Sequence, residues 1–188
     1  MTEILLVRHG QTDWNLEGRI QGHSDIPLNS TGISQSEVLA ESIKDDPFDA
    51  VFSSDLSRAM QTAQIIAARL RVPLYCDSRL REVNHGAWEG MLIKVVRDTH
   101  QDAYAAFRND QPGACPPGGE TLQEAILRME TAVARAAASY PEGRIVLVSH
   151  GLSLALLRCR LNDAPLSLSH QYGLDNCTGE MIHWQTRR

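Results

Sequence analysis

Residues 4–10 read Ile-Leu-Leu-Val-Arg-His-Gly, and residues 147–151 read Leu-Val-Ser-His-Gly. Both segments contain Leu-Val-x-His-Gly, in which the end of an apolar run typical of a buried strand is followed by a histidine and a glycine turn. Parallel strands present their carboxyl ends at one edge of a sheet, where ligands bind. The repeat therefore predicts that His9 and His150 face each other in one site. The alternative is a coincidence between two strand ends, with backbone groups satisfying each imidazole.

Strand and helix patterns alternate along most of the chain. A third buried strand is predicted at 49–53, beside those at 4–7 and 144–149. Helical periodicity marks 31–44, 55–70 and 121–139, and a further apolar helix follows Gly151; residues 170–184 are predicted to form one or two final strands. A Thr121…Glu124 capping box opens the 121–139 helix. This alternation predicts an α/β fold with a mainly parallel central sheet flanked by helices.

The segment 81–119 does not fit this alternation. It contains three prolines and the Gly118-Gly119 pair, which favour turns over regular elements. We expect one domain over residues 1–188, in which 81–119 forms an insertion or lid over the active site.

Composition excludes several classes of protein. The net charge of −5 over 188 residues, without a run of Lys or Arg, argues against a nucleic-acid partner. No apolar run approaches the roughly 20 residues of a membrane helix, so no membrane partner is expected. The opening residues do not resemble a signal peptide, and the four cysteines form no C-x-x-C pair. These features predict a cytoplasmic protein with reduced thiols.

Two arginines accompany the paired histidines. Arg8 precedes His9, and Arg58 lies in the first turn expected for the 55–70 helix, if Ser54 or Asp55 caps that helix. Helix N-termini favour anions, and this helix and the one after His150 would both begin at the same sheet edge. Guanidinium groups, imidazoles and helix N-termini together form a receptor for a phosphate dianion. Taken singly, Arg58 also fits a solvated or ion-paired surface residue.

The chemistry expected at such a receptor is phosphoryl transfer to an imidazole. A neutral His9 could attack phosphorus and form a covalent intermediate. Glu82 is the best placed carboxyl to protonate the leaving alcohol, and burial beside a phosphate dianion would raise its pKa. Nothing local distinguishes Glu82 from Glu89. The histidines lack H-x-x-x-H and H-E-x-x-H spacing, and no P-loop or G-x-G-x-x-G motif occurs, so no metal or nucleotide cofactor is expected.

At these residues the chain resembles the histidine phosphatase superfamily, also called phosphoglycerate mutase-like. Its signature block matches residues 6–15, Leu-Val-Arg-His-Gly-Gln-Thr-Asp-Trp-Asn, and continues through 18–28. Further blocks match 53–63, 80–90 and 148–151, in the family's order and over nearly the whole chain. One departure is the largely apolar segment 91–96. The family more commonly has polar residues directly after the Trp88-Glu89-Gly90 block, so this segment indicates an unusual lid over the substrate.

The resemblance implies a role for each matching position. His9 would be phosphorylated, Glu82 would be the proton donor, and no metal or other cofactor would be needed. The phosphoryl oxygens would be held by Arg8, Arg58 and His150. The residues expected to line the phosphate or substrate pocket are Asn15, Gln21, Gly22 and Gly151.

Within the family, the chain resembles the small phosphatases, such as α-ribazole phosphatases and broad-specificity phosphatases. The segment after Glu82 is short and holds only the cations Lys94, Arg97 and Arg108, whereas the mutases carry a longer, more basic insertion. The expected partner is a small phosphorylated metabolite, with α-ribazole phosphate, phosphoserine and sugar phosphates as candidates. A cofactor-dependent phosphoglycerate mutase and a catalytically silent phospholigand-binding protein remain alternatives. A homodimer is left open.

Overall fold

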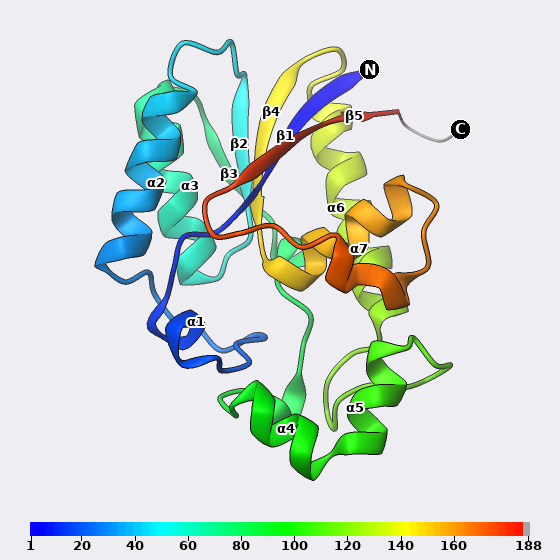
Figure 1. The fold of residues 1–188 in the computed structure, drawn as a ribbon. Helices are drawn as coiled ribbons and strands as arrows, with labels where there is room; N and C mark the ends of the chain where they lie inside the picture. The colour runs from blue at the N-terminus through cyan, green and yellow to red at the C-terminus, as the bar shows by residue number, and fades with distance from the viewer. Residues whose placement is uncertain (186–188) are drawn as a thin grey trace.

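In the computed structural model, which describes residues 1–185, helices cover both faces of a central five-stranded sheet (Figure 1). The strand order is β3-β2-β4-β1-β5; β1 to β4 pair in parallel and β5 pairs antiparallel with β1. The strands are β1 (Thr2–Arg8), β2 (Ala50–Ser53), β3 (Leu74–Cys76), β4 (Arg144–Ser149) and β5 (Gly179–Trp184). The predicted α/β class with a mainly parallel sheet is confirmed.

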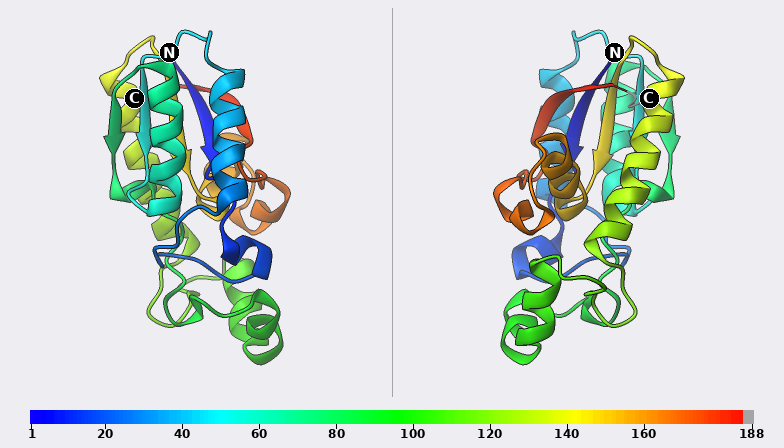
Figure 2. Two further views of the ribbon diagram at one scale, coloured as in Figure 1. Left: turned by 90° about the vertical axis from the view of Figure 1, so that its left-hand side faces the viewer. Right: turned by 90° about the vertical axis from the view of Figure 1, so that its right-hand side faces the viewer.

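The long helices form one layer on each side of the sheet. Helices α2 (Ser30–Ser42) and α3 (Ser57–Leu70) cover one face, and α6 (Leu122–Ser139) and α7 (Gly151–Leu161) cover the other (Figure 2). The short helices α1 (Asp13–Glu17), α4 (Ile93–Thr99) and α5 (Gln101–Arg108) lie beyond the carboxyl ends of the parallel strands (Figure 1). These short helices therefore enclose the edge of the sheet at which the parallel strands end.

The central strands are apolar because both faces are covered. Side chains alternate between the faces, so Ile4, Leu6, Ile145 and Leu147 pack with α6 and α7, whereas Leu5, Val7, Val146 and Val148 pack with α2 and α3. All eight are at most 9% exposed. This double burial explains why the runs at 4–7 and 145–148 contain no polar residue.

Helix boundaries follow the predicted signals in one case and depart from them in another. The Thr121–Glu124 capping box opens α6 as predicted. Helix α3 begins at Ser57 with Leu56 as its N-cap, so the prediction that Ser54 or Asp55 caps it was wrong. The capping carboxylate comes instead from a distant loop, as described below.

Other local structure was missed from the sequence. Strand β3 is a three-residue edge strand, too short to show a periodic pattern. The tail forms one strand, β5, preceded by a 3₁₀ helix at Leu166–Gln171. The segment 81–119 contains a 3₁₀ turn (Gly86–Trp88), α4 and α5. Within residues 1–185, no helix is both long and apolar enough to span a membrane.

Candidate active site

The carboxyl edge of the sheet brings the two repeated segments together. Strands β1 and β4 are parallel neighbours in which Arg8 is paired with Ser149, so His9 and His150 leave the sheet side by side. Their ring centroids are 5.1 Å apart. The proximity predicted from the repeat is thus present in the structure.

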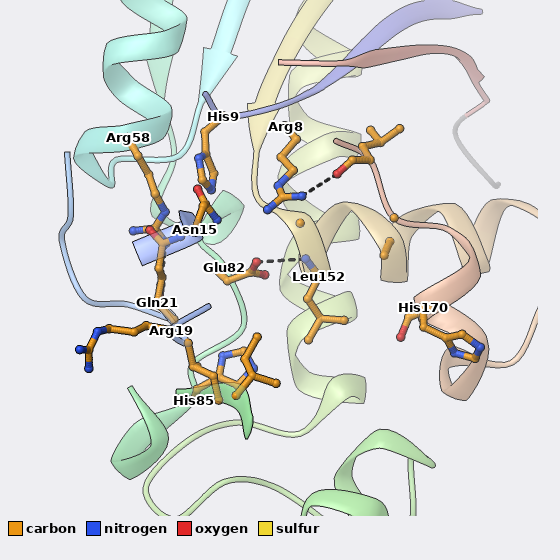
Figure 3. A pocket seen from close by; sticks show the side chains of 18 of the residues that line it. Arg8, His9, Asn15, Arg19, Gln21, Arg58, Glu82, His85, Leu152 and His170 are labelled. Carbon is orange, nitrogen blue, oxygen red and sulfur yellow. Dashed lines mark hydrogen bonds between the residues drawn. The ribbon is translucent and has the colours of Figure 1, made fainter. Parts of the chain in front are cut away.

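A pocket of about 310 Å³ opens at this edge (Figure 3). Eight of the nine residues expected at the site line it: Arg8, His9, Asn15, Gln21, Gly22, Arg58, Glu82 and Gly151. His150 is fully buried behind them and is not a lining residue. The structure therefore brings the predicted residues together, but His150 contacts Arg58 rather than the pocket itself.

The hydrogen bond of His9 defines which ring nitrogen carries the proton. Nδ1 lies 2.7 Å from the carbonyl oxygen of Gly10, which only accepts, so Nδ1 donates and Nε2 carries a lone pair in the neutral ring. Burial, and then the charges of Arg58 and Arg8, hold the pKa of His9 well below its usual value. The side-chain NH₂ group of Asn176 donates to the backbone carbonyl of His9 at 2.9 Å. His9 is thus a neutral, oriented imidazole whose free nitrogen is Nε2.

His150 has the opposite tautomer. Arg58 Nε donates to His150 Nδ1 at 3.2 Å, and because a guanidinium never accepts, the proton of the neutral ring is on Nε2. Nε2 then donates to the Ser54 hydroxyl at 2.8 Å. Burial, and next the charge of Arg58, lower the pKa of His150 well below its ordinary value. Both ring nitrogens are already hydrogen-bonded within the protein.

Arg58 is a buried cation held by backbone carbonyls. Its Nη1 donates to Ser24 at 2.8 Å and its Nη2 to Gly22 at 2.7 Å, and the side chain is fully buried. Burial lowers its pKa to about 10, so the guanidinium stays protonated at neutral pH. The alternative of a solvated surface arginine is therefore wrong. Gly22 has φ +51°, and a Cβ there would meet Glu89 Oε1 at 2.2 Å, which explains a glycine at this position.

Arg8 supplies the second positive charge. Its Nη1 donates to the Leu174 carbonyl at 2.7 Å, and its buried Nε has no partner among the described residues. Burial lowers its pKa, but an arginine remains charged at neutral pH. A Cβ on Gly151 would lie only 3.3 Å from Arg8 Nε, so the glycine leaves room for the guanidinium.

Glu82 is bound to the first turn of α7. Its Oε2 accepts from Leu152 N at 3.0 Å, and its Oε1 accepts from Ser153 N and Val83 N, both at 2.9 Å. Burial is the largest influence on its pKa and would raise it, but these amides together with the charge of His85 outweigh burial and lower the pKa. The raised pKa expected from desolvation is thus not found in the protein alone.

Some donors in the first turns of the two helices at this edge bind carboxylates of the protein. The α7 amides bind Glu82, and in α3 both the amide and hydroxyl of Ser57 donate to the Asp25 carboxylate at 2.7 and 2.8 Å. These donors are occupied in the protein, and the prediction that both N-termini would serve the anion stays a prediction. Carboxylates distant in sequence satisfy these donors.

Asn15 and Gln21 are joined by Thr12. Asn15 Oδ1 accepts from the Thr12 backbone amide at 3.0 Å, and the single proton of the Thr12 hydroxyl is donated to Gln21 Oε1 at 3.1 Å. Since the carbonyl oxygens of both side chains bind Thr12, the two NH₂ groups are the donors left for the pocket.

The pocket is also lined by residues that were not selected as site residues from the sequence. They are Arg19, Ile20, His85, Ile93, Leu152, Ala155, Ser169, His170, Gly173 and Leu174, together with Arg108, which was noted only as a cation of the insertion. Arg19 is ion-paired with Glu17 and donates to the Gly90 carbonyl. His85 lies within the 80–90 block, three residues after Glu82. This position is the sequence feature that could have identified it as a pocket residue. Among residues 1–185, no cluster of three or more His, Cys, Asp or Glu side chains could hold a metal ion.

Comparisons with known proteins agree with this geometry. The probable phosphoglycerate mutase GpmB of Proteus mirabilis is 35% identical over 185 residues, covering 98% of this chain and 86% of the relative. A mycobacterial glucosyl-3-phosphoglycerate phosphatase structure is 31% identical with a TM-score of 0.86, covering 97% of this chain and 92% of the other. The α-ribazole phosphatase of Shigella flexneri is 31% identical with a TM-score of 0.85, covering 97% and 91%. Residues 4–188 match the family model of the histidine phosphatase superfamily (branch 1). This chain is an enzyme of that superfamily and belongs to its branch 1.

Proposed function

We propose that this enzyme is a metal-independent phosphomonoesterase that hydrolyses a small phosphorylated metabolite through a phosphohistidine on His9. The observation that carries the proposal is the state of His9. Its Nδ1 proton is donated to the Gly10 carbonyl, the ring is neutral, and the buried Arg58 and the half-buried Arg8 lie beside it. A neutral Nε2 next to fixed positive charge is suited to attack phosphorus.

In the first step, the phosphoryl oxygens lie against Arg8 and Arg58. His9 Nε2 forms a bond to phosphorus while the bond from phosphorus to the ester oxygen breaks. The departing alcohol oxygen takes a proton from the Glu82 carboxyl. The arginines neutralise the charge on the transferring group, which is most of what phosphoryl transfer requires.

The protonation of Glu82 is coupled to substrate binding. Its pKa lies below the ordinary value in the protein alone. A phosphate dianion entering beside it repels the carboxylate and raises the pKa, so binding and proton uptake proceed together. The resulting carboxylic acid is then available to the leaving alcohol.

In the second step, water attacks the phosphohistidine and the bond between His9 and phosphorus breaks. Glu82, now a carboxylate, accepts the proton of that water. Inorganic phosphate leaves and His9 returns to its neutral form.

The remaining site residues bind the phosphoryl group or place its ligands. The NH₂ groups of Asn15 and Gln21 are donors to phosphoryl oxygens. Gly151 leaves room for Arg8, and the Gly22 carbonyl accepts from Arg58. His150 orients Arg58 through Nδ1. It can bind a phosphoryl oxygen directly only if its Nε2–H leaves the Ser54 hydroxyl.

The substrate is proposed to be a monophosphate of a small alcohol. Neighbouring structures are named as phosphatases of α-ribazole phosphate, glucosyl-3-phosphoglycerate and phosphoserine. The pocket lining combines the apolar residues Ile20, Ile93 and Leu152 with the half-buried Arg108. Such apolar residues accommodate a largely uncharged remainder, and Arg108 is available to one polar group on it.

A phosphoglycerate mutase is the second candidate, because relatives 35% identical over nearly the whole chain are named as probable mutases. A mutase would transfer the phosphoryl group from His9 back to a bound phosphoglycerate. Activity that depends on 2,3-bisphosphoglycerate separates this candidate from hydrolysis.

The test is hydrolysis of p-nitrophenyl phosphate in excess EDTA by the wild type, His9→Ala and His183→Ala. His183 lies on β5 away from the pocket and serves as the matched control. Samples are quenched at alkaline pH, because acid hydrolyses a bond between phosphorus and histidine, and then analysed by mass spectrometry for one added phosphoryl group.

We expect metal-free turnover and a phosphorylated His9 peptide in the wild type and His183→Ala, and neither in His9→Ala. Turnover by His9→Ala at the wild-type rate would refute the phosphohistidine route. Absent turnover with bisphosphoglycerate-dependent isomerisation would establish the mutase, and phosphate binding without either activity would establish a silent binding protein.

A further inference from the structure

The segment that carries Glu82 has its backbone held by side chains. It comprises the end of the 3₁₀ turn Ser78–Leu80 and the first residues of the 81–119 segment, which lie outside any helix or strand. Each carbonyl from residue 79 to residue 82 nevertheless accepts a side-chain hydrogen bond. The donors are Arg128 to Arg79, Arg81 and Glu82, Ser149 to Leu80, Ser153 to Arg81, and His23 to Glu82.

Arg128, on α6, makes the largest share of these contacts. Its Nη1 donates to the carbonyls of Arg79 and Arg81 at 2.8 and 2.7 Å, and its Nη2 donates to the Glu82 carbonyl at 2.8 Å. A guanidinium has five donors in a rigid plane, so a single side chain fixes three carbonyls of this backbone.

Glu120 completes the arrangement from the other side. Its carboxylate accepts from Arg128 Nε at 3.0 Å and from Nη2 at 2.5 Å, a two-point ion pair with both side chains mostly buried. Glu120 Oε1 also accepts from Asn84 N at 2.7 Å, and Glu120 N donates to the Asn84 carbonyl at 3.0 Å. The pair therefore joins the start of the 81–119 segment to the residue that follows its end.

We infer that the Glu120–Arg128 pair is a positioning device for the proton donor of the proposed reaction. It holds the 79–84 backbone so that the Glu82 carboxyl meets the leaving oxygen, and it touches neither substrate nor phosphate. Neither residue lines the pocket. The inference rests on the proposed function, because it needs Glu82 to be the general acid.

The role predicts a specific kinetic signature. General acid catalysis contributes roughly 10²–10⁴-fold to rate and matters most for basic leaving groups. p-Nitrophenyl phosphate and phenyl phosphate are close in shape but differ in leaving-group basicity, so the ratio of their kcat/KM values reports proton donation. A merely structural loss lowers both values by the same factor.

The experiment measures this ratio in the wild type, Glu82→Gln, Arg128→Met, Arg128→Lys, Glu120→Gln and the double variant Glu82→Gln/Arg128→Met. Arg135→Met is the matched control, since Arg135 is an exposed arginine on the same helix. We expect Glu82→Gln and Arg128→Met to favour p-nitrophenyl phosphate by about tenfold or more over the wild-type ratio. Arg128→Lys and Glu120→Gln should be intermediate, and Arg135→Met unchanged.

The double variant makes the test decisive. If Arg128 acts through Glu82, the ratio in the double variant equals that in Glu82→Gln, and the inhibition constant of inorganic phosphate stays within about twofold of wild type in Arg128→Lys. Equal losses on both substrates in the Arg128 and Glu120 variants, with a changed ratio in Glu82→Gln, would overturn this inference alone. An unchanged ratio in Glu82→Gln would overturn the acid role and the inference together. Should Arg128→Met fail to fold, Arg128→Lys and Glu120→Gln carry the same comparison.

Discussion

The two active-site histidines differ in which ring nitrogen carries the proton, because they face different partners. A backbone carbonyl faces Nδ1 of His9, whereas a guanidinium faces Nδ1 of His150. The proton of His9 is therefore on Nδ1 and that of His150 on Nε2. The repeated motif places two imidazoles at one edge of the sheet. Their neighbours leave a lone pair on Nε2 of His9, whereas both ring nitrogens of His150 are hydrogen-bonded.

The state of His9 predicts how activity depends on pH. Burial and the adjacent arginines depress its pKa, so the imidazole proposed as the nucleophile stays neutral as the pH falls below 6.5, the ordinary value. We expect kcat/KM for p-nitrophenyl phosphate, corrected for ionisation of the substrate, to show no loss between pH 7.5 and 6.5. An acidic limb centred at or above pH 6.5 that is assigned to the free enzyme would contradict the depressed pKa.

At the scale of elements, helix ends in this protein are closed in two ways. Helix α6 is capped by its own sequence through Thr121 and Glu124, whereas α3 and α7 are closed by Asp25 and Glu82 from distant segments. Local caps can be recognised from sequence spacing. Remote caps connect a helix to another part of the chain, and in α7 that connection also places a proposed catalytic carboxyl.

The local cap of α6 can be tested without disturbing the active site. Thr121→Ala removes the hydroxyl that accepts from Glu124 N at 3.1 Å, and should lower the free energy of unfolding by about 1 kcal/mol. Thr131→Ala, on the exposed face of the same helix, should change it by less than about 0.5 kcal/mol. Urea unfolding measures both, and kcat should be unaltered. Equal effects of the two variants would show that the capping box does not contribute.

At the scale of the whole molecule, burying the site affects stability as well as catalysis. His9 and His150 are buried and His85 is half-buried, and burial is the first cause of the lowered pKa in each. In the unfolded chain each imidazole regains a pKa near 6.5. Below that pH the unfolded state binds more protons than the folded state, so acid favours unfolding.

We expect the free energy of unfolding to fall as the pH is lowered from 7.5 to 5.5. Each buried histidine contributes up to about 1.4 kcal/mol per pH unit between 6.5 and its folded pKa. Urea unfolding at several pH values measures the slope, and His85→Asn, whose amide can still donate to the Val83 carbonyl, should reduce it. A slope unaffected by that substitution, or stability that rises toward pH 5.5, would refute the coupling.

Much of the architecture was predictable because it depends on local pattern. Apolar runs at 4–7 and 144–149 indicate strands buried on both faces, and the stripe at 121–139 with its capping box indicates α6. Since parallel strands end at one edge, the same pattern also predicts that Arg8, His9 and His150 lie together. The resemblance of the motifs to the superfamily, which the family match confirms, adds Arg58 and Glu82 to the set.

The sequence alone determined the central strands and the long helices, and it placed His9 and His150 at strand ends, because propensity, periodicity and capping act over a few residues. Tertiary structure decided which side chains meet. Glu82 reaches the α7 amides of residues about 70 positions away, whereas Glu89 binds the His23 amide and the Ser24 hydroxyl. Arg128 holds the Glu82 backbone from α6. Such contacts depend on how helices dock on the sheet, a long-range packing outcome that no local spacing encodes.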